Sequence, residues 1–135
     1  MRYQPLNVLD VHRGVFLTFH DIMAALSPRV ADTCWTLGEF TEVDGTKLLE
    51  MVVEGSNGLD EDPVINRLPH SQLAEAMKSV RQIIWGTLTG YERTSPTPWI
   101  VLSAIDSSFW RIETDDLETR RRIRRKFTHV REGFR

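Results

Sequence analysis

The sequence predicts an α+β fold: a single domain over residues 1–135, in which an antiparallel sheet of three to five strands packs against three to four helices. Two observations predict it. From Ile83 to residue 113 the apolar period approaches two, and turn residues separate three strand-like segments. Elsewhere, apolar residues recur at helical spacing behind residues that favour helix N-termini. A chain of 135 residues with 41% apolar residues can bury a core without disulfides.

In the N-terminal half, the sequence predicts one helix and one strand. Thr18 and Asp21 have the spacing of a capping box and place a helix at residues 19–27. The β-forming residues 33–43 predict a strand, and Asp44-Gly45 directly after them is typical of a hairpin turn.

Residues 46–54 fit two structures. They match the return strand of that hairpin, but their apolar residues also follow i, i+1, i+4, i+5 spacing, and their composition favours helix. Helix is the preferred interpretation. Residues 55–69 are rich in turn-forming residues and predict a loop.

In the C-terminal half, Ser71 is expected to cap a helix whose apolar stripe extends to Ile84. The three predicted strands cover residues 83–92, 99–105 and 109–113. A last helix is expected from Asp115, with Glu118 at the capping-box position. Its basic residues follow its acidic first turn, an order that complements the helix dipole.

Charge is unevenly distributed along the chain. Residues 1–119 carry 9 Lys/Arg against 18 Asp/Glu, whereas residues 120–135 carry 8 Lys/Arg against one acid, Glu132. The preferred interpretation of the basic helix is a solvated face. The alternative is a nucleic-acid-binding or regulatory module. The arginines that would contact phosphates are Arg120, Arg121, Arg124 and Arg125.

The second charged candidate is the acidic loop formed by Asp60, Glu61 and Asp62. It lacks the alternating carboxylates and distal Glu of a calcium loop. A solvated loop is the simpler interpretation, but clustered carboxylates also steer the approach of a basic protein. The loop is therefore the predicted partner-binding segment.

Four tryptophans lie in predicted strands. Core burial is the favoured interpretation for each of them. Phe109 and Trp110 must point to opposite faces of their strand, however, so one of them could be exposed. Trp110 is the candidate anchor, because exposed tryptophans often dominate binding energy at interfaces.

No catalytic or metal-binding signature is present. The histidines are not spaced as ligands, Cys34 is the single cysteine and is expected in the core, and no nucleophile elbow or phosphate loop occurs. We therefore expect no enzyme, metal or cofactor. A lone cysteine, no signal peptide and no apolar run of roughly 20 residues predict a cytoplasmic protein outside the membrane.

The segment Trp-Ile-Val-Leu-Ser-Ala-Ile-Asp-Ser-Ser-Phe-Trp-Arg-Ile-Glu-Thr-Asp-Asp, followed by a charged helix, resembles small bacterial immunity proteins. The resemblance covers residues 99–127. It implies a cytoplasmic antidote that binds and blocks a toxin domain, often a basic nuclease. A small enzyme or ligand-binding domain is a further alternative, in which distant carboxylates and histidines would assemble a site.

Overall fold

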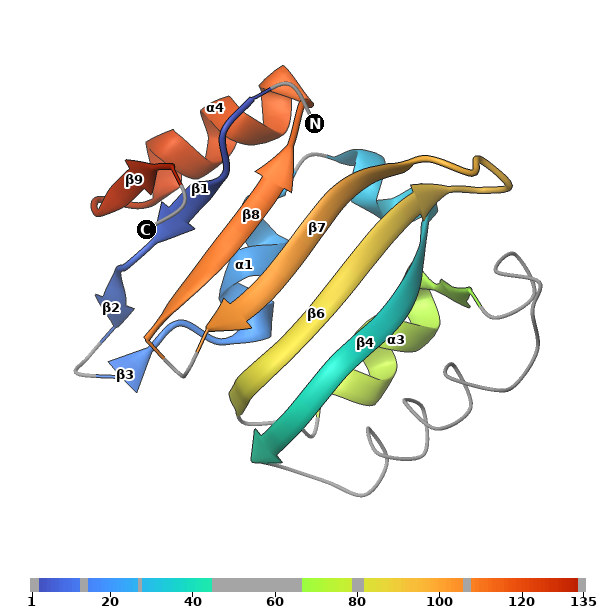
Figure 1. The fold of residues 1–135 in the computed structure, drawn as a ribbon, viewed down its shortest axis with the longest axis horizontal. Helices are drawn as coiled ribbons and strands as arrows, with labels where there is room; N and C mark the ends of the chain where they lie inside the picture. The colour runs from blue at the N-terminus through green and yellow to red at the C-terminus, as the bar shows by residue number, and fades with distance from the viewer. Residues whose placement is uncertain are drawn as a thin grey trace.

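The computed structural model describes residues 3–12, 15–26, 28–44, 67–78, 82–105 and 108–133. It has an α+β fold, built from a seven-stranded antiparallel sheet, a two-stranded hairpin and helices (Figure 1). The seven-stranded sheet has the order β5-β4-β6-β7-β8-β1-β9. Its strands are β1 (Leu6–Val8), β4 (Thr33–Asp44), β5 (Leu68–Pro69), β6 (Gln82–Glu92), β7 (Pro98–Ile105), β8 (Phe109–Thr114) and β9 (Val130–Glu132).

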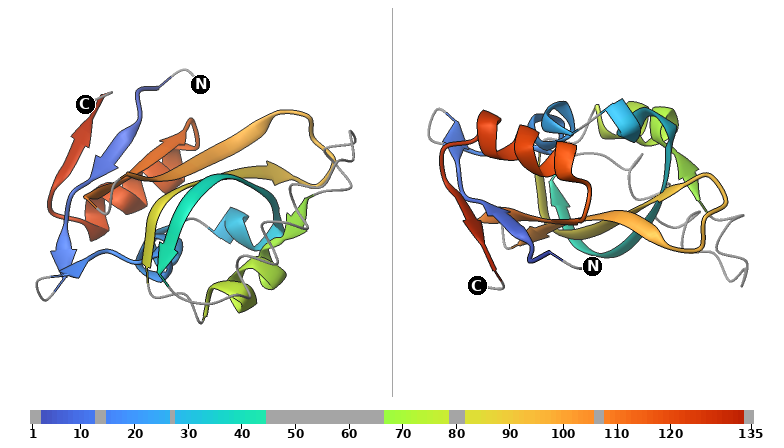
Figure 2. Two further views of the ribbon diagram at one scale, coloured as in Figure 1. Left: turned by 60° about the horizontal axis from the view of Figure 1, so that its bottom comes forward. Right: turned by 90° about the horizontal axis from the view of Figure 1, so that it is seen from above.

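The other elements lie around this sheet. The strands β2 (Val11–His12) and β3 (Val15–Phe16) pair with each other. The helices are α1 (Phe19–Ala25), the 3-10 helix η1 (Pro28–Asp32), α3 (His70–Met77) and α4 (Leu117–Lys126). Figure 2 shows these helices on one face of the sheet, so the described chain forms two layers.

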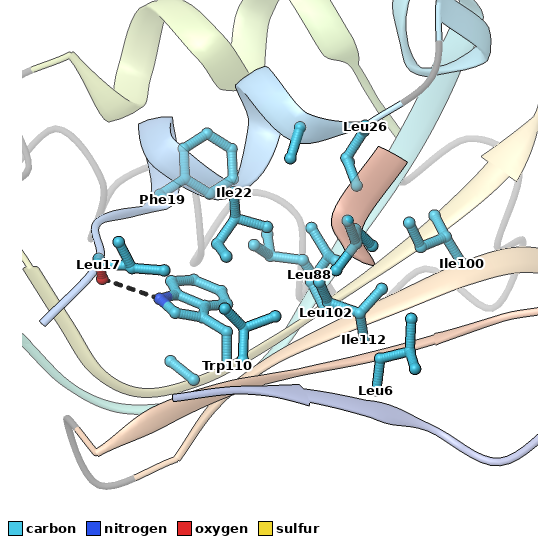
Figure 3. Close-up of a cluster of buried hydrophobic side chains, with 14 of the residues drawn as sticks. Leu6, Leu17, Phe19, Ile22, Leu26, Leu88, Ile100, Leu102, Trp110 and Ile112 are labelled. Atoms are coloured by element: carbon cyan, nitrogen blue, oxygen red, sulfur yellow. Dashed lines mark hydrogen bonds between the residues drawn. The ribbon is translucent and has the colours of Figure 1, made fainter. Parts of the chain in front are cut away.

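Alternation along the central strands fills the space between the layers. On β7, Ile100, Leu102 and Ala104 are buried, while Val101 and Ser103 between them are half-buried. Trp110 and Ile112 continue the buried row on β8. Figure 3 shows these side chains meeting those of α1. Each large apolar side chain buried in this way contributes about 1.5–3 kcal/mol, so this row supplies much of the driving force for folding.

Gly90 allows neighbouring side chains of the sheet to pack closely against the β6 backbone. A Cβ at this position would lie 2.7 Å from Ile100 Cγ2 and 2.9 Å from both Trp35 Cζ3 and Thr33 Cγ2. Real Cβ atoms do not approach other atoms so closely. The absence of a side chain at Gly90 therefore lets the Trp35 ring approach the β6 backbone, where the indole is fully buried.

The predicted α+β class and the three central strands are confirmed, but the predicted strand number is wrong. The main sheet has seven strands, beyond the expected three to five. The additional strands β1 and β9 have three residues each. The strand β1 pairs with the free edge of β8, and β9 then pairs with the free edge of β1. Leu68–Pro69, expected in a loop, pairs with Cys34 and Trp35 of β4.

The helix predicted behind Ser71 is also corrected. The helix α3 begins at His70, and its N-cap is Pro69, which makes no side-chain cap hydrogen bond. It ends at Met77, and Ile84 belongs to β6 instead. The helical spacing of apolar residues continues past the end of α3 in the sequence. The structure departs from it there because the β6 backbone pairs with β4 on one side and with β7 on the other.

The capping predictions have different outcomes. The Thr18 capping box is present, with its side chain accepting from the backbone N–H of Asp21. For α4, the N-cap is Asp116 rather than Asp115, and its carboxylate accepts from Thr119 N at 3.0 Å. Glu118 does not complete a capping box there, so its carboxylate remains free for other contacts. The predicted turn at Gly45, the 46–54 segment and the loop from residue 55 to 66 lie outside the described residues.

Candidate functional site

The acidic loop of Asp60, Glu61 and Asp62 lies outside the described residues. Its role as a partner-binding segment therefore stays a prediction. The other candidate residues all have defined positions, and these positions change which surface is the best candidate for binding.

Trp110 is buried and is not available as an anchor. Its side chain is 4% exposed, and its indole Nε1 donates to the carbonyl oxygen of Leu17 at 3.0 Å (Figure 3). Phe109, on the opposite face of β8, is half-buried. The favoured interpretation of core burial is correct for Trp35, Trp99 and Trp110.

Arg120 is likewise buried, and its guanidinium is hydrogen-bonded within the protein. It is 6% exposed, and its guanidinium donates to the carbonyl oxygens of Gln4 at 2.9 Å and Thr114 at 3.1 Å. It also donates to Glu132 Oε1 at 3.0 Å. The second Glu132 oxygen accepts from Arg124 at 3.0 Å. Two of the four arginines proposed for nucleic acid thus hold the N-terminal segment and β9 against α4.

Arg121 and Arg125 are exposed on α4. Arg124 is exposed as well, but it is paired with Glu132. Because Arg120 is buried, the four arginines do not share one exposed phosphate-binding surface.

An acidic surface instead forms where β7 begins and α4 starts, near the upper edge of the sheet in Figure 1. Two hollows lie there on either side of Arg29, with cavity volumes of about 490 and 530 Å³. We call the residues lining both hollows the acidic end. These residues are Arg29, Asp32, Glu92, Arg93, Thr94, Ser95, Pro98, Trp99, Asp115, Asp116, Leu117 and Glu118.

Arg29 organises the acidic end. Its guanidinium lies 4.5 Å from the centroid of the Trp99 ring, and it forms ion pairs with Glu92 and, at 3.4 Å, with Asp116. The Trp99 indole Nε1 in turn donates to Thr33 Oγ1 at 3.0 Å. These contacts fix the wall between the two hollows, since a stacked and doubly paired guanidinium loses most of its freedom.

Some of the other carboxylates at the acidic end have hydrogen-bond partners within the protein, and others do not. Asp115 Oδ1 accepts from the backbone N–H of Tyr3 at 2.9 Å, and Asp116 caps α4. Asp32 and Glu118 are exposed, and no ion pair or hydrogen bond engages either side chain within the described part of the chain. These two charges are the ones available to a partner.

Leu117 gives the acidic end an apolar contact. It is the first residue of α4 and is 52% exposed. The buried face of this helix is formed by Thr119, Arg120 and Ile123. Leu117 therefore presents its side chain to solvent beside the acids of the acidic end.

Outside the acidic end, one titratable group has a perturbed environment. The Trp35 indole N–H donates to His70 Nδ1 at 3.2 Å, which requires this nitrogen to be unprotonated because indole is only a donor. Burial lowers the pKa of His70 below its ordinary value of 6.5. His70 is therefore held neutral and serves as an acceptor for a core tryptophan.

Across the described residues, no three His, Cys, Asp or Glu side chains gather in a way that could hold a metal ion. Cys34 is a half-buried free thiol. Every helix in these ranges is too short or too polar to cross a bilayer.

Comparison with known proteins adds no relative. No family model matches the chain, and no significant match is found among curated proteins or solved structures.

Proposed function

We propose that this chain is a small binding protein of the immunity type, which binds a toxin domain through its acidic end and blocks it. The observation that carries the proposal is the composition of that surface. Five carboxylates and two guanidinium groups surround Trp99 and the exposed Leu117. A basic toxin domain has the complementary charge.

The two kinds of side chain at the acidic end have different roles in such a complex. Asp32 and Glu118, which are exposed, supply long-range attraction and raise the association rate. Leu117 supplies apolar area that binding removes from water, at about 25 cal/mol per Å². The stacked pair of Arg29 and Trp99 keeps this surface in one conformation, which reduces the entropy lost on binding.

The resemblance to immunity proteins involves the same part of the chain. Residues 99–127 include Trp99, Leu117 and the three acids at the start of α4. The loop of Asp60, Glu61 and Asp62 is expected to add negative charge to the interaction. Its contribution is tested separately from that of the acidic end, by reversing its charges alone.

The test is capture of a partner by the tagged chain from lysate of its source organism, with nuclease treatment and mass spectrometry. We expect a protein to be retained in stoichiometric amounts after nuclease treatment. Glu118→Lys should reduce the retained amount at least fivefold. The matched control Glu75→Lys reverses an exposed glutamate on α3 and should retain the wild-type amount. Equal retention by both variants would remove the acidic end from the interface.

A further inference from the structure

A groove between α1 and α4 carries only positive charge. It is lined by Ala24 and Ala25 of α1 and by Arg122, Arg125 and Lys126 of α4, and its cavity volume is about 250 Å³. We call it the basic groove. Figure 2 shows the two helices side by side on the helical face of the sheet, where they contact each other. The two alanines leave the room that larger side chains on α1 would fill.

The spacing of the three cations explains why they converge. Positions i, i+3 and i+4 share one face of a helix, so Arg122, Arg125 and Lys126 project together toward α1. Arg120 and Arg124, also i and i+4, point to the other side and contact Glu132. The helix α4 thus has one pair of arginines that shares Glu132, one group of three cations that lines the groove, and the exposed Arg121.

The group of three lacks the partners that the other pair has. No carboxylate lines the groove, and among the described residues none of its three cations forms an ion pair or a hydrogen bond. Arg122 Nε is buried from water and has no hydrogen-bond acceptor. A buried donor without an acceptor and three adjacent like charges both destabilise the folded chain, and an anion in the groove would relieve both.

We propose that the basic groove binds a phosphoryl group. Arg122 and Arg125 offer planar forks that match the oxygens of a phosphate, and Lys126 adds a mobile point charge. The groove is smaller than pockets that take drug-sized ligands, which favours the phosphoryl group itself over a large organic body. Its position at the C-terminal half of α4 makes this site separate from the acidic end at the N-terminus of the same helix.

The phosphoryl group can come from a small phosphate or from a nucleic-acid backbone. Both sources use the same contacts, but they differ in how many further charges they bring. Arg120 and Arg124 are already paired with Glu132, so the three cations of the groove engage few phosphates at once. A polynucleotide should therefore gain little over pyrophosphate.

The experiment is a titration of the full chain with sodium pyrophosphate and, separately, with a six-nucleotide single-stranded DNA, at low ionic strength. Calorimetry measures affinity, and backbone amide NMR shifts locate the site. We expect saturable pyrophosphate binding, with shifts at Ala24 and Ala25. Arg122→Gln combined with Lys126→Gln should weaken it at least tenfold.

The matched control combines Arg121→Gln with Arg131→Gln, which removes the same charge from exposed positions outside the groove. It should bind pyrophosphate within twofold of wild type. Oligonucleotide binding at least tenfold tighter than pyrophosphate, with the same loss in the groove variant, would support the site and assign it to nucleic acid. The proposal is overturned if wild type binds neither probe, if the shifts lie elsewhere, or if both double variants lose affinity equally.

Discussion

Replacing Arg120 with methionine should destabilise the protein strongly, although the residue lies in the most basic segment of the chain. Methionine keeps the length and apolar contacts of the stem but removes the guanidinium. That group donates to the carbonyl oxygens of Gln4 and Thr114, in a side chain that is 6% exposed. The Thr114 carbonyl would lose a charged donor without gaining access to water, whereas the carbonyl of the exposed Gln4 is partly solvated.

The magnitude follows from these contacts. A hydrogen bond to a charged group contributes about 1.5–3 kcal/mol, but partial solvation of the Gln4 carbonyl reduces its share. The Glu132 ion pair adds little, because that carboxylate is largely exposed and keeps Arg124 as a partner. We expect a loss of about 3 kcal/mol in the free energy of unfolding, or about 10 °C in Tm for a chain of this size.

The assay is urea unfolding followed by tryptophan fluorescence, with thermal unfolding by circular dichroism. The matched control is Arg124→Met, the same change on the same helix at a side chain that is 46% exposed and shares Glu132. The control should lose about 0.5 kcal/mol or less. Equal losses in the two variants, or a loss below about 1 kcal/mol for Arg120→Met, would refute the structural role of the buried guanidinium.

Two further predictions concern the core. Gly90→Ala should lower the free energy of unfolding in urea by about 2 kcal/mol, because the new methyl group would overlap Ile100. The control Gly38→Ala, where a Cβ meets nothing within 4 Å, should lower it by less than about 0.5 kcal/mol. A similar loss in both variants would contradict close packing at Gly90. Since the pKa of His70 is lowered in the folded state, its contribution to stability is present above pH 6.5 and is lost as pH falls through the folded-state pKa. Tm measured from pH 8 to pH 5 should therefore fall less in His70→Gln than in wild type, and parallel curves would refute a linkage through the Trp35 hydrogen bond.

Much of the fold could be predicted from local patterns. The central strands β6, β7 and β8 have alternating residues between turn residues, and Thr18 with Asp21 sets the start of α1. The strands β1 and β9 could not be predicted in the same way. Three residues do not define a period, and these strands exist because a distant strand, β8, offers β1 an edge.

The candidate sites show the same division between local and distant information. The spacing of Arg122, Arg125 and Lys126 on one helix face is visible in the sequence. The burial of Arg120 is not, because its acceptors on Gln4 and Thr114 come together only in the folded chain. The acidic end likewise combines η1, the β6–β7 turn and the start of α4, so no single segment indicates it.

A growth assay with the captured partner tests the antidote function directly. We predict that the partner expressed alone stops the growth of a bacterial host, and that co-expression of the wild-type chain restores growth. Glu118→Lys should restore it less than Glu75→Lys does. A partner that does not inhibit growth, or inhibition that the wild-type chain leaves unchanged, would contradict an antidote function.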